Sequence, residues 1–172
     1  KNNHGYLSDI ANSVGKVPEW TSFGKYGGAF DFTGNGVDQG QSIRVPHNTD
    51  LSLDPGSGDF AITFWMRTRP DYDADVLRQG STATATTWYK VEHSPVGYAD
   101  KFSLDVNTDG TRRILYSNSS YNDERWHFVV AQRVGDTAEL WVDSTDYVSD
   151  SVTGSIANTA NLAIGSKDTQ DD

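Results

Sequence analysis

The chain has 172 residues, a formal net charge of −10 and no cysteine. This length suits one domain with a sizeable hydrophobic core, and the lack of cysteine excludes disulfides, thiol catalysis and thiolate metal sites. Because an acidic surface repels phosphates and no apolar run approaches the roughly 20 residues that cross a bilayer, we expect neither nucleic-acid binding nor membrane insertion.

The acidic residues are nearly all aspartate, and glutamate occurs only at Glu19, Glu92, Glu124 and Glu139. Aspartate favours turns, where its short carboxylate bonds nearby backbone, whereas glutamate favours helices. No helical periodicity persists over three turns, while short segments alternate with period two. These patterns together predict an all-β protein rich in loops.

Ten segments have the alternating or continuous apolar pattern of strands. In chain order they are Gly28–Phe32, Ser42–Val45, Asp59–Arg69, Asp75–Arg78, Thr87–Glu92, Lys101–Val106, Arg113–Ser117, Trp126–Arg133, Ala138–Val142 and Leu162–Ile164. Clusters of Gly, Asn, Asp, Ser and Pro separate them. Strands at this spacing predict an antiparallel sandwich or jelly roll.

The segment Asp59–Arg69 has the strongest strand pattern. One face carries Phe60, Ile62, Phe64 and Met66, and the other carries Ala61, Thr63, Trp65 and Arg67. Large side chains on both faces indicate a strand in the middle of its sheet. We expect one face to pack between two sheets and the other to line a concave surface.

Two later strands are joined by a short polar turn. Trp126-His127 opens an apolar run, Gly135-Asp136 follows it, and Ala138–Val142 forms the second run. A Gly-Asp pair between two such runs predicts a tight β-hairpin.

Three blocks carry a family resemblance. They are Gly24–Gly34 with Ile43–Pro46, Asp59–Arg67, and Trp126–Val130 leading to Leu140–Asp143. In order and spacing they resemble the laminin-G-like members of the concanavalin A-like lectin/glucanase superfamily, over roughly Gly24 to Gly165. The resemblance implies one domain over residues 1–172, built as a two-sheet antiparallel jelly-roll sandwich. Gly27-Gly28 suits the tight turn in the first block, because glycine adopts backbone angles that other residues avoid.

The chain departs from the resembled family at both ends, where members have one more strand each. We therefore expect a fragment of a longer protein that lacks its first and last strands. Other domains or subunits would then complete the sheet, since unpaired edges invite aggregation.

Catalytic chemistry is not indicated. Retaining glycosidases need two carboxylates about 5–5.5 Å apart, and the Glu-x-Asp-x-x-Glu motif that provides them in the resembled superfamily is absent. His127 has no Ser or Asp pattern around it that suggests a triad. We therefore expect no enzymatic activity, and we interpret His127 as a structural residue without catalytic partners.

Asp105, Asn107, Asp109 and Gly110 match the start of an EF-hand loop, D-x-N-x-D-G. The twelfth position, however, is Tyr116 where a bidentate Glu is needed, and strands rather than helices flank the segment. A hairpin turn through Asp109-Gly110 is the favoured interpretation.

A different calcium site is implied by the resemblance alone. Some laminin-G-like domains bind Ca²⁺ at the rim of the sandwich, and Asp100 and Asn158 occupy comparable positions. Backbone and water would supply most of the six to eight ligands. The alternative is that both residues cap turns.

Aromatic side chains in loop-like segments suggest a platform for stacking on sugar rings. The candidates are Tyr72, Trp88, Tyr89, Tyr98 and Tyr121. The alternative, favoured for Trp88, is that these rings are buried at the edge of the core.

The sequence therefore predicts a non-enzymatic recognition module that binds a glycan or another surface ligand, secreted or on a cell or virion surface. A second hypothesis is a structural or assembly domain of a fibre, capsid decoration or multidomain adhesin that binds no sugar. A third is an atypical carbohydrate-active enzyme. Function depends on the site and not on the fold, so the three differ in what the loops and faces of the sandwich carry.

Overall fold

Antiparallel strands make up all the regular structure in the part of the chain that the computed structural model describes, which is residues 5–9, 17–32, 41–47, 59–68, 74–80, 87–109 and 111–165. The strands are β1 (Tyr6–Asp9), β2 (Glu19–Gly24), β3 (Gly27–Asp31), β4 (Gln41–Val45), β5 (Phe60–Met66), β6 (Ala74–Gln79), β7 (Trp88–His93), β8 (Phe102–Asn107), β9 (Arg112–Tyr116), β10 (His127–Val134), β11 (Thr137–Val142), β12 (Asp146–Ser151) and β13 (Leu162–Ile164). In these ranges no helix occurs, and so none is long and apolar enough to cross a membrane.

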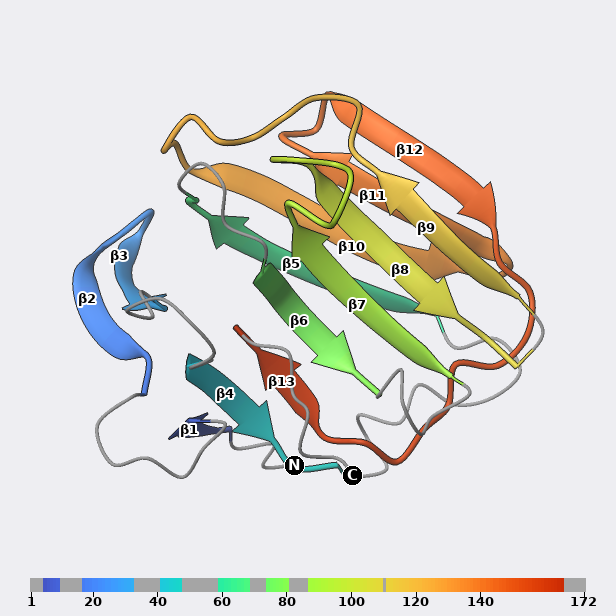
Figure 1. Cartoon of the computed structure of the whole chain (residues 1–172), viewed down its shortest axis with the longest axis horizontal. Coiled ribbons are helices and arrows are strands. Elements are labelled where there is room, and N and C mark those ends of the chain that lie inside the picture. Colours follow the sequence, from blue (N-terminus) through green and yellow to red (C-terminus); the bar gives the residue numbers. More distant parts are fainter. Residues whose placement is uncertain are drawn as a thin grey trace.

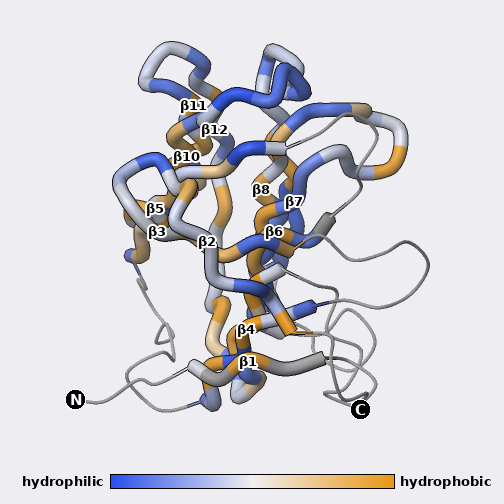
Figure 2. The backbone as a smooth tube through the Cα atoms, turned by 90° about the vertical axis from the view of Figure 1, so that its left-hand side faces the viewer, coloured by the Kyte–Doolittle hydropathy of each residue, from blue (hydrophilic) through white to orange (hydrophobic). Residues whose placement is uncertain are grey.

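Two sheets form the layers of a sandwich (Figure 1). The larger has the order β1-β4-β13-β6-β7-β8-β9, and the smaller has the order β12-β11-β10-β5. Strands β2 and β3 pair only with each other and form a separate hairpin beside the sandwich. Figure 2 shows the smaller sheet on one side and β6, β7 and β8 on the other. The expectation of an all-β sandwich is confirmed.

The core lies between the sheets because alternate residues of each strand point inward. In β10, for example, Val129 and Ala131 are fully buried while their neighbours are half-buried. Val91 and Leu104 meet them from the larger sheet, and all four belong to one cluster of buried side chains. Burial of this apolar surface is the main force that holds the two layers together.

All ten predicted strands are present, and three further strands were not predicted. These three are β1, β2 and β12. The sequence of β12, Asp146–Ser151, contains three polar or acidic residues in its last half and lies at the edge of its sheet. An edge strand of this kind packs only one face on the core, so its apolar pattern in the sequence is weak.

The turn predictions are confirmed. Gly135 has a φ of 56° and joins β10 to β11, with Val134 paired to Thr137. Gly27 has a φ of 98°, which explains why glycine stands at the turn between β2 and β3. The segment after Asp105 forms the β8–β9 hairpin and no EF-hand, since Asn107 pairs with Arg112.

The expected position of β5 in mid-sheet is wrong. β5 pairs with β10 on one side, and no other described strand pairs with its second edge. Its outward residue Trp65 is nevertheless half-buried, because Tyr26 of the β2–β3 turn contacts it edge-on at 5.7 Å between ring centroids. Aromatic contacts across the outer face, and not a neighbouring strand, account for the large side chains on both faces of β5.

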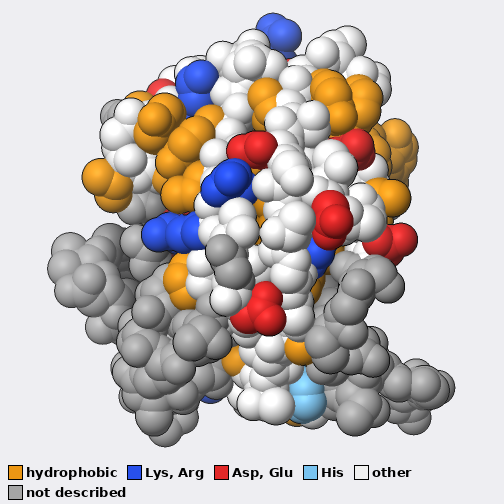
Figure 3. All heavy atoms as spheres, turned by 90° about the vertical axis from the view of Figure 1, so that its right-hand side faces the viewer, with side chains coloured by type: hydrophobic (Ala, Val, Ile, Leu, Met, Phe, Trp, Pro, Cys, Tyr) orange, Lys and Arg blue, Asp and Glu red, His pale blue; other side chains and the backbone are white. Residues whose placement is uncertain are grey.

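Charges of both signs are mixed on the face of the molecule drawn in Figure 3. On the side drawn in Figure 3, Asp and Glu side chains alternate with Lys and Arg, and hydrophobic side chains gather above them on both flanks. A pair of opposite charges, Arg113 and Asp150, joins β9 to β12 at 3.2 Å.

Candidate functional site

The outward face of the larger sheet carries a group of charged side chains. In β7, Tyr89, Val91 and His93 point into the core, so Trp88, Lys90 and Glu92 point outward. Register with the neighbouring strands brings further side chains to the same face. The resulting outer-face cluster consists of Asp75, Arg78, Trp88, Lys90, Glu92, Asp105 and Arg112.

Ion pairs connect the members of the outer-face cluster. Arg112 bonds Asp105 through both Nε, at 3.1 Å, and Nη2, at 2.8 Å. Lys90 Nζ lies 2.6 Å from Glu92 Oε1 and 3.7 Å from Asp105 Oδ2. Three carboxylates thus face three cations, with Arg78 near Asp75 as the third pair, and the cluster has no net formal charge. The bond to Asp105 raises the pKa of Arg112 further.

Several polar atoms of the cluster are buried without a hydrogen-bond partner. They are both carboxylate oxygens of Asp75, the Nε of Arg78 and the indole Nε1 of Trp88. Arg78 Nη1 lies 3.3 Å from Asp75 Oδ2, which is an ion pair without hydrogen-bond geometry. Buried polar atoms without partners are uncommon in folded proteins and each calls for an explanation.

The environment of Asp75 favours its protonated form. Only 1% of its surface is exposed, and burial raises the pKa of its carboxyl to about 6. The positive charges of Arg78 and Lys90 oppose this change, while Glu92, directly across in β7, adds to it. Asp75 therefore changes its charge near pH 6.

Aromatic rings lie beside the cluster. Tyr98, from the loop between β7 and β8, stacks on Tyr116 of β9 with a centroid distance of 3.7 Å and an interplanar angle of 13°. Tyr98 is 44% exposed. The Arg112 guanidinium lies over the Trp88 ring at 5.4 Å. This part of the face combines an exposed ring with charged hydrogen-bonding groups, which is the composition of sugar-binding surfaces.

The aromatic residues predicted to form one exposed platform lie in different parts of the structure. Tyr98 is exposed as expected. Tyr89 is only 5% exposed and stacks on Phe60 in the core, so the prediction that it joins an exposed platform is wrong. Trp88 is also buried, as the alternative interpretation favoured, because Arg112 covers it. Tyr72 lies outside the described residues.

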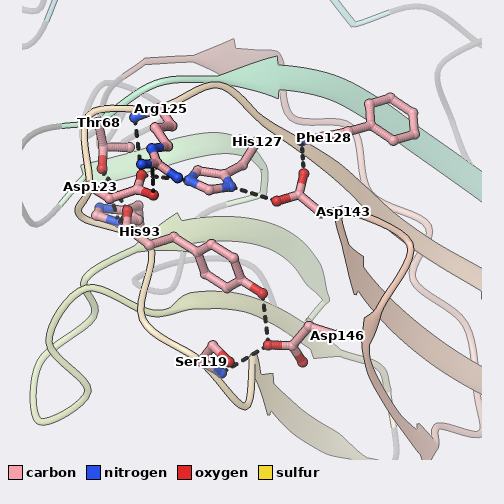
Figure 4. Close-up of polar contacts among 10 residues, drawn as sticks. Thr68, His93, Ser119, Asp123, Arg125, His127, Phe128, Asp143 and Asp146 are labelled. Atoms are coloured by element: carbon pink, nitrogen blue, oxygen red, sulfur yellow. Dashed lines mark hydrogen bonds and ion pairs between the residues drawn. The ribbon is translucent and has the colours of Figure 1, made fainter.

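Tyr121 belongs to a polar network at one end of the sandwich (Figure 4). Its hydroxyl donates to Asp146 Oδ2 at 2.9 Å, and Asp146 also accepts from the backbone N–H groups of Asn118 and Ser119. Burial alone would raise the pKa of Asp146, but these bonds outweigh it and hold the pKa below its ordinary value. The network fixes the loop after β9 against β12, so Tyr121 serves the fold.

His127 lies in the same region, between two carboxylates. Its Nδ1 is 2.6 Å from Asp143 Oδ2, and its Nε2 is 2.8 Å from Asp123 Oδ1. Burial alone lowers the pKa of His127, but the bonds to both carboxylates outweigh it, and the pKa lies above its ordinary value. The statement that His127 has no partners is therefore wrong, since Asp143, 16 residues further along the chain, and Asp123, four residues before it, both meet the ring in the fold.

The His127 network contains no nucleophile, however. Asp143 holds the backbone N–H of Phe128 through its second oxygen at 2.8 Å. The nearby hydroxyl of Thr68 bonds His93 and the Tyr121 carbonyl instead. Because each group is occupied by the fold, the structural interpretation of His127 fits the geometry better than general-base catalysis.

The two predicted calcium ligands lie at opposite ends of β8. Asp100 precedes the strand, whereas Asp109 follows it and bonds Ser155 near Asn158. Six strand residues at roughly 3.3 Å each separate these ends by about 20 Å, so Asp100 and Asn158 cannot bind one ion together. Asn158 instead caps its own turn through Ala160 N–H at 3.0 Å. Calcium binding itself stays a prediction.

Six members of this face were missed as site residues in the sequence. They are Asp75, Arg78, Lys90, Glu92, Asp105 and Arg112. The available signal was the alternation of charged and apolar residues in β7 and β8, which places charges on one face. The alternation does not predict the order of the strands in the sheet, so it cannot show that these charged side chains lie next to one another.

Comparison with known proteins supports the fold. A family model described as the concanavalin A-like lectin/glucanases superfamily matches residues 35–172. A search among curated proteins finds no match. The matched range includes every strand of the sandwich except β1, and the β2–β3 hairpin lies before it.

Three solved structures have the same fold. Mouse laminin alpha1 domains LG4-5 superpose with a TM-score of 0.58 and 12% identity, covering 76% of this chain and 32% of that one. The binding domain of Paraclostridial Mosquitocidal Protein 1 superposes with a TM-score of 0.65 and 13% identity, covering 95% of this chain and 40% of that one. The third structure is domain 4 of AbnA, a GH43 extracellular arabinanase from Geobacillus stearothermophilus, solved in complex with arabinotriose. It superposes with a TM-score of 0.65 and 15% identity, covering 95% of this chain and 73% of that one. The chain spans less than half the length of the first two, and identities this low establish the fold alone.

Proposed function

Because this chain belongs to the concanavalin A-like lectin/glucanase superfamily, we propose that it is a non-enzymatic module that binds a glycan outside the cell, in a secreted protein or on a cell or virion surface. The observation that carries this proposal is the exposed Tyr98 ring stacked on Tyr116, on the face that also carries the Arg112 side chain, which is 48% exposed. Aromatic rings hold the apolar face of a sugar, and charged groups orient its hydroxyls.

The arrangement of carboxylates supports binding over hydrolysis. Glu92 lies across from Asp75, as a catalytic pair would, but it is held by Lys90 at 2.6 Å. Asp105 is likewise held by Arg112. A general acid and a nucleophile both need access to the glycosidic bond, whereas these carboxylates are buried and neutralised by cations.

The test is binding to immobilised and free oligosaccharides, with arabinotriose as the first probe because a domain of the same fold was solved with it. We expect Tyr98→Ala to weaken binding about three- to tenfold, since an aromatic stacking contact contributes roughly 0.5–1.5 kcal/mol. Tyr147→Ala is the matched control, because Tyr147 is also exposed but lies on the smaller sheet.

Two outcomes would contradict the proposal. One is the absence of binding across a broad glycan array, and the other is the appearance of new reducing ends when the chain is incubated with arabinan, β-glucans and alginate. The second result would favour a carbohydrate-active enzyme.

A structural or assembly role is the second candidate, and the open edge of β5 favours it. The smaller sheet ends at β5 among the described residues, while the larger sheet continues past it with β6, β13 and β4. The inward residues Val76, Leu162 and Ile164 are only partly buried there. A strand from another domain or subunit that paired with β5 would cover them.

A further inference from the structure

The β2–β3 hairpin carries four exposed aromatic side chains within its short length. Trp20 is 68% exposed, Phe23 78%, Tyr26 80% and Phe30 44%. Elsewhere in the described ranges only two other Phe, Tyr or Trp side chains are exposed. Exposed apolar side chains that gather in one place mark a surface that binds a protein or a membrane, whereas scattered single ones do not.

The charges of the hairpin are separated along its length. Glu19 and Asp31 are register partners at its open end, and Lys25 lies in the turn at the other end. Between Glu19 and Asp31, Lys25 is the only charged residue. The aromatic turn therefore carries a positive charge, in a chain whose net charge is −10, and both acidic residues lie at the base.

Aromatic contacts hold the turn beside β5. Tyr26 meets Trp65 edge-on at 5.7 Å between ring centroids, and Lys25 Nζ lies 4.7 Å from the centre of the Trp65 ring. Trp65 in turn contacts Phe128 of β10 at 5.2 Å. The turn thus lies at the outer face of the smaller sheet, while most of its own aromatic surface stays in solvent.

The hairpin has few polar groups that could select a sugar. Apart from the aromatic rings, the only polar side chains between its two acidic residues are those of Thr21, Ser22 and Lys25. The Thr21 hydroxyl already accepts a hydrogen bond from the N–H of Phe23 at 3.2 Å. A sugar site combines an aromatic ring with several fixed polar side chains, and the hairpin lacks this second part.

The exposed rings are not confined to one face of the hairpin. Trp20 and Phe30 are register partners and share one face of the strands, whereas Phe23 and Tyr26 flank the turn. A protein partner covers a surface of matching shape, but a lipid interface surrounds an inserted turn and needs no such match. Tryptophan and tyrosine favour that interface, because each ring has an apolar body and one polar group.

We propose that the β2–β3 hairpin binds a phospholipid surface, with the rings of Trp20, Phe23 and Tyr26 among the headgroups and its acidic base in water. Lys25 then lies beside the lipid phosphates. The expectation against membrane insertion rested on the lack of an apolar run that crosses a bilayer, and a hairpin lying at the surface needs none. A few partly buried rings give weak and reversible binding, as a single lipid anchor does.

Cosedimentation of the 172-residue chain with phosphatidylcholine vesicles tests the proposal. We expect the parent to bind and Phe23→Ser to lower its partition coefficient about tenfold, since the variant loses the burial of one large apolar side chain. Val96→Ser is the matched control, because Val96 is 89% exposed in the loop between β7 and β8 and should not matter. Both replaced side chains are largely in solvent, so the melting temperature should stay unchanged.

Two further variants report on the geometry of the contact. Brominated phosphatidylcholine should quench part of the tryptophan fluorescence of the parent, and Trp20→Phe should remove that quenched part while it keeps an aromatic ring. Lys25→Glu should weaken binding to vesicles that contain phosphatidylglycerol more than binding to pure phosphatidylcholine, because a lysine beside an anionic surface is attracted to it.

The inference is overturned if the parent does not bind vesicles at any lipid concentration, or if Phe23→Ser and Val96→Ser bind alike. A dimer that Phe23→Ser abolishes, without any binding to vesicles, overturns it in favour of a second copy of the chain. Because phosphatidylcholine carries no sugar, each of these results leaves the glycan-binding function standing.

Discussion

At the scale of single residues, the position of His127 shows how a packing residue acquires a charge. The imidazole has a carboxylate at each ring nitrogen, Asp143 at 2.6 Å and Asp123 at 2.8 Å. An acceptor at both nitrogens favours the imidazolium, because only that form donates from both, and the pKa of His127 is raised accordingly. The ring joins the loop before β10 to the end of β11 through its contacts with Asp123 and Asp143.

This arrangement predicts a pH-dependent stability. The pKa of His127 is raised in the folded state, so its stabilising contribution is complete below the unfolded pKa of about 6.5 and is lost as the pH rises through the folded value. The pKa of Asp123 is lowered by its bond to His127, so the contribution of Asp123 is present above about 3.8, its unfolded pKa, and is lost as the pH falls through the folded value. We expect His127→Gln to destabilise the domain more at pH 6 than at pH 9.

Urea unfolding of parent and variant at several pH values measures this difference. Asp75 also titrates near pH 6, and subtracting the parent curve removes its effect because both proteins contain it. A difference in unfolding free energy that stays constant from pH 5 to 9 would show that the ring is neutral in the fold.

At the scale of secondary structure, the β2–β3 hairpin differs from every other described strand pair. It joins neither sheet, and its aromatic side chains are largely in solvent, with Trp20 68%, Phe23 78% and Tyr26 80% exposed. The Trp20 ring lies over Gly28, where an added Cβ would come within 2.6 Å of the indole. A two-stranded hairpin with so little burial is marginally stable on its own.

We therefore predict rapid amide exchange in the hairpin. Amide protons of β2 and β3 should exchange at least tenfold faster than those of β7 and β8, because local opening of the hairpin exposes little buried surface. Hydrogen exchange followed by mass spectrometry measures both pairs in one sample. Gly28→Ala should speed exchange in the hairpin further by displacing Trp20, and it should leave β7 and β8 unchanged. Protection of the hairpin equal to that of β8 would contradict the prediction.

At the scale of the whole molecule, the two sheets are unequal, and this inequality leaves β5 open. Within the described part of the chain, its second edge presents backbone groups without a strand partner, and such edges pair readily with other chains. The fully buried core side chains lie where the two sheets overlap. Toward β6 and β13, the side chains of Val76, Leu162 and Ile164 are only partly buried. The open edge and the thinner core lie on the same side of the sandwich.

The open edge predicts self-association that a single charge should suppress. Thr63 lies on the outer face of β5, and Thr63→Lys places a charge at the edge that a second copy would approach. In analytical ultracentrifugation we expect a dimer fraction that grows with concentration in the parent and shrinks in the variant. Ser149→Lys makes the matched change on β12, the opposite edge of the same sheet. An equal effect of both variants, or a parent that stays monomeric at every concentration, would contradict a role for β5.

The sequence by itself determined ten of the thirteen described strands, the predicted turns and the fold family. Alternation assigns each residue of β7 and β8 to a face, and Gly27 and Gly135 mark turns, because these signals depend only on neighbours along the chain. The tertiary structure alone decided which side chains meet. Asp75 and Glu92, or His127 and Asp143, are brought together by strand order and register, which depend on the packing of the whole core. For the same reason Tyr89 proved to be a core residue and the outer-face cluster could be recognised only after folding.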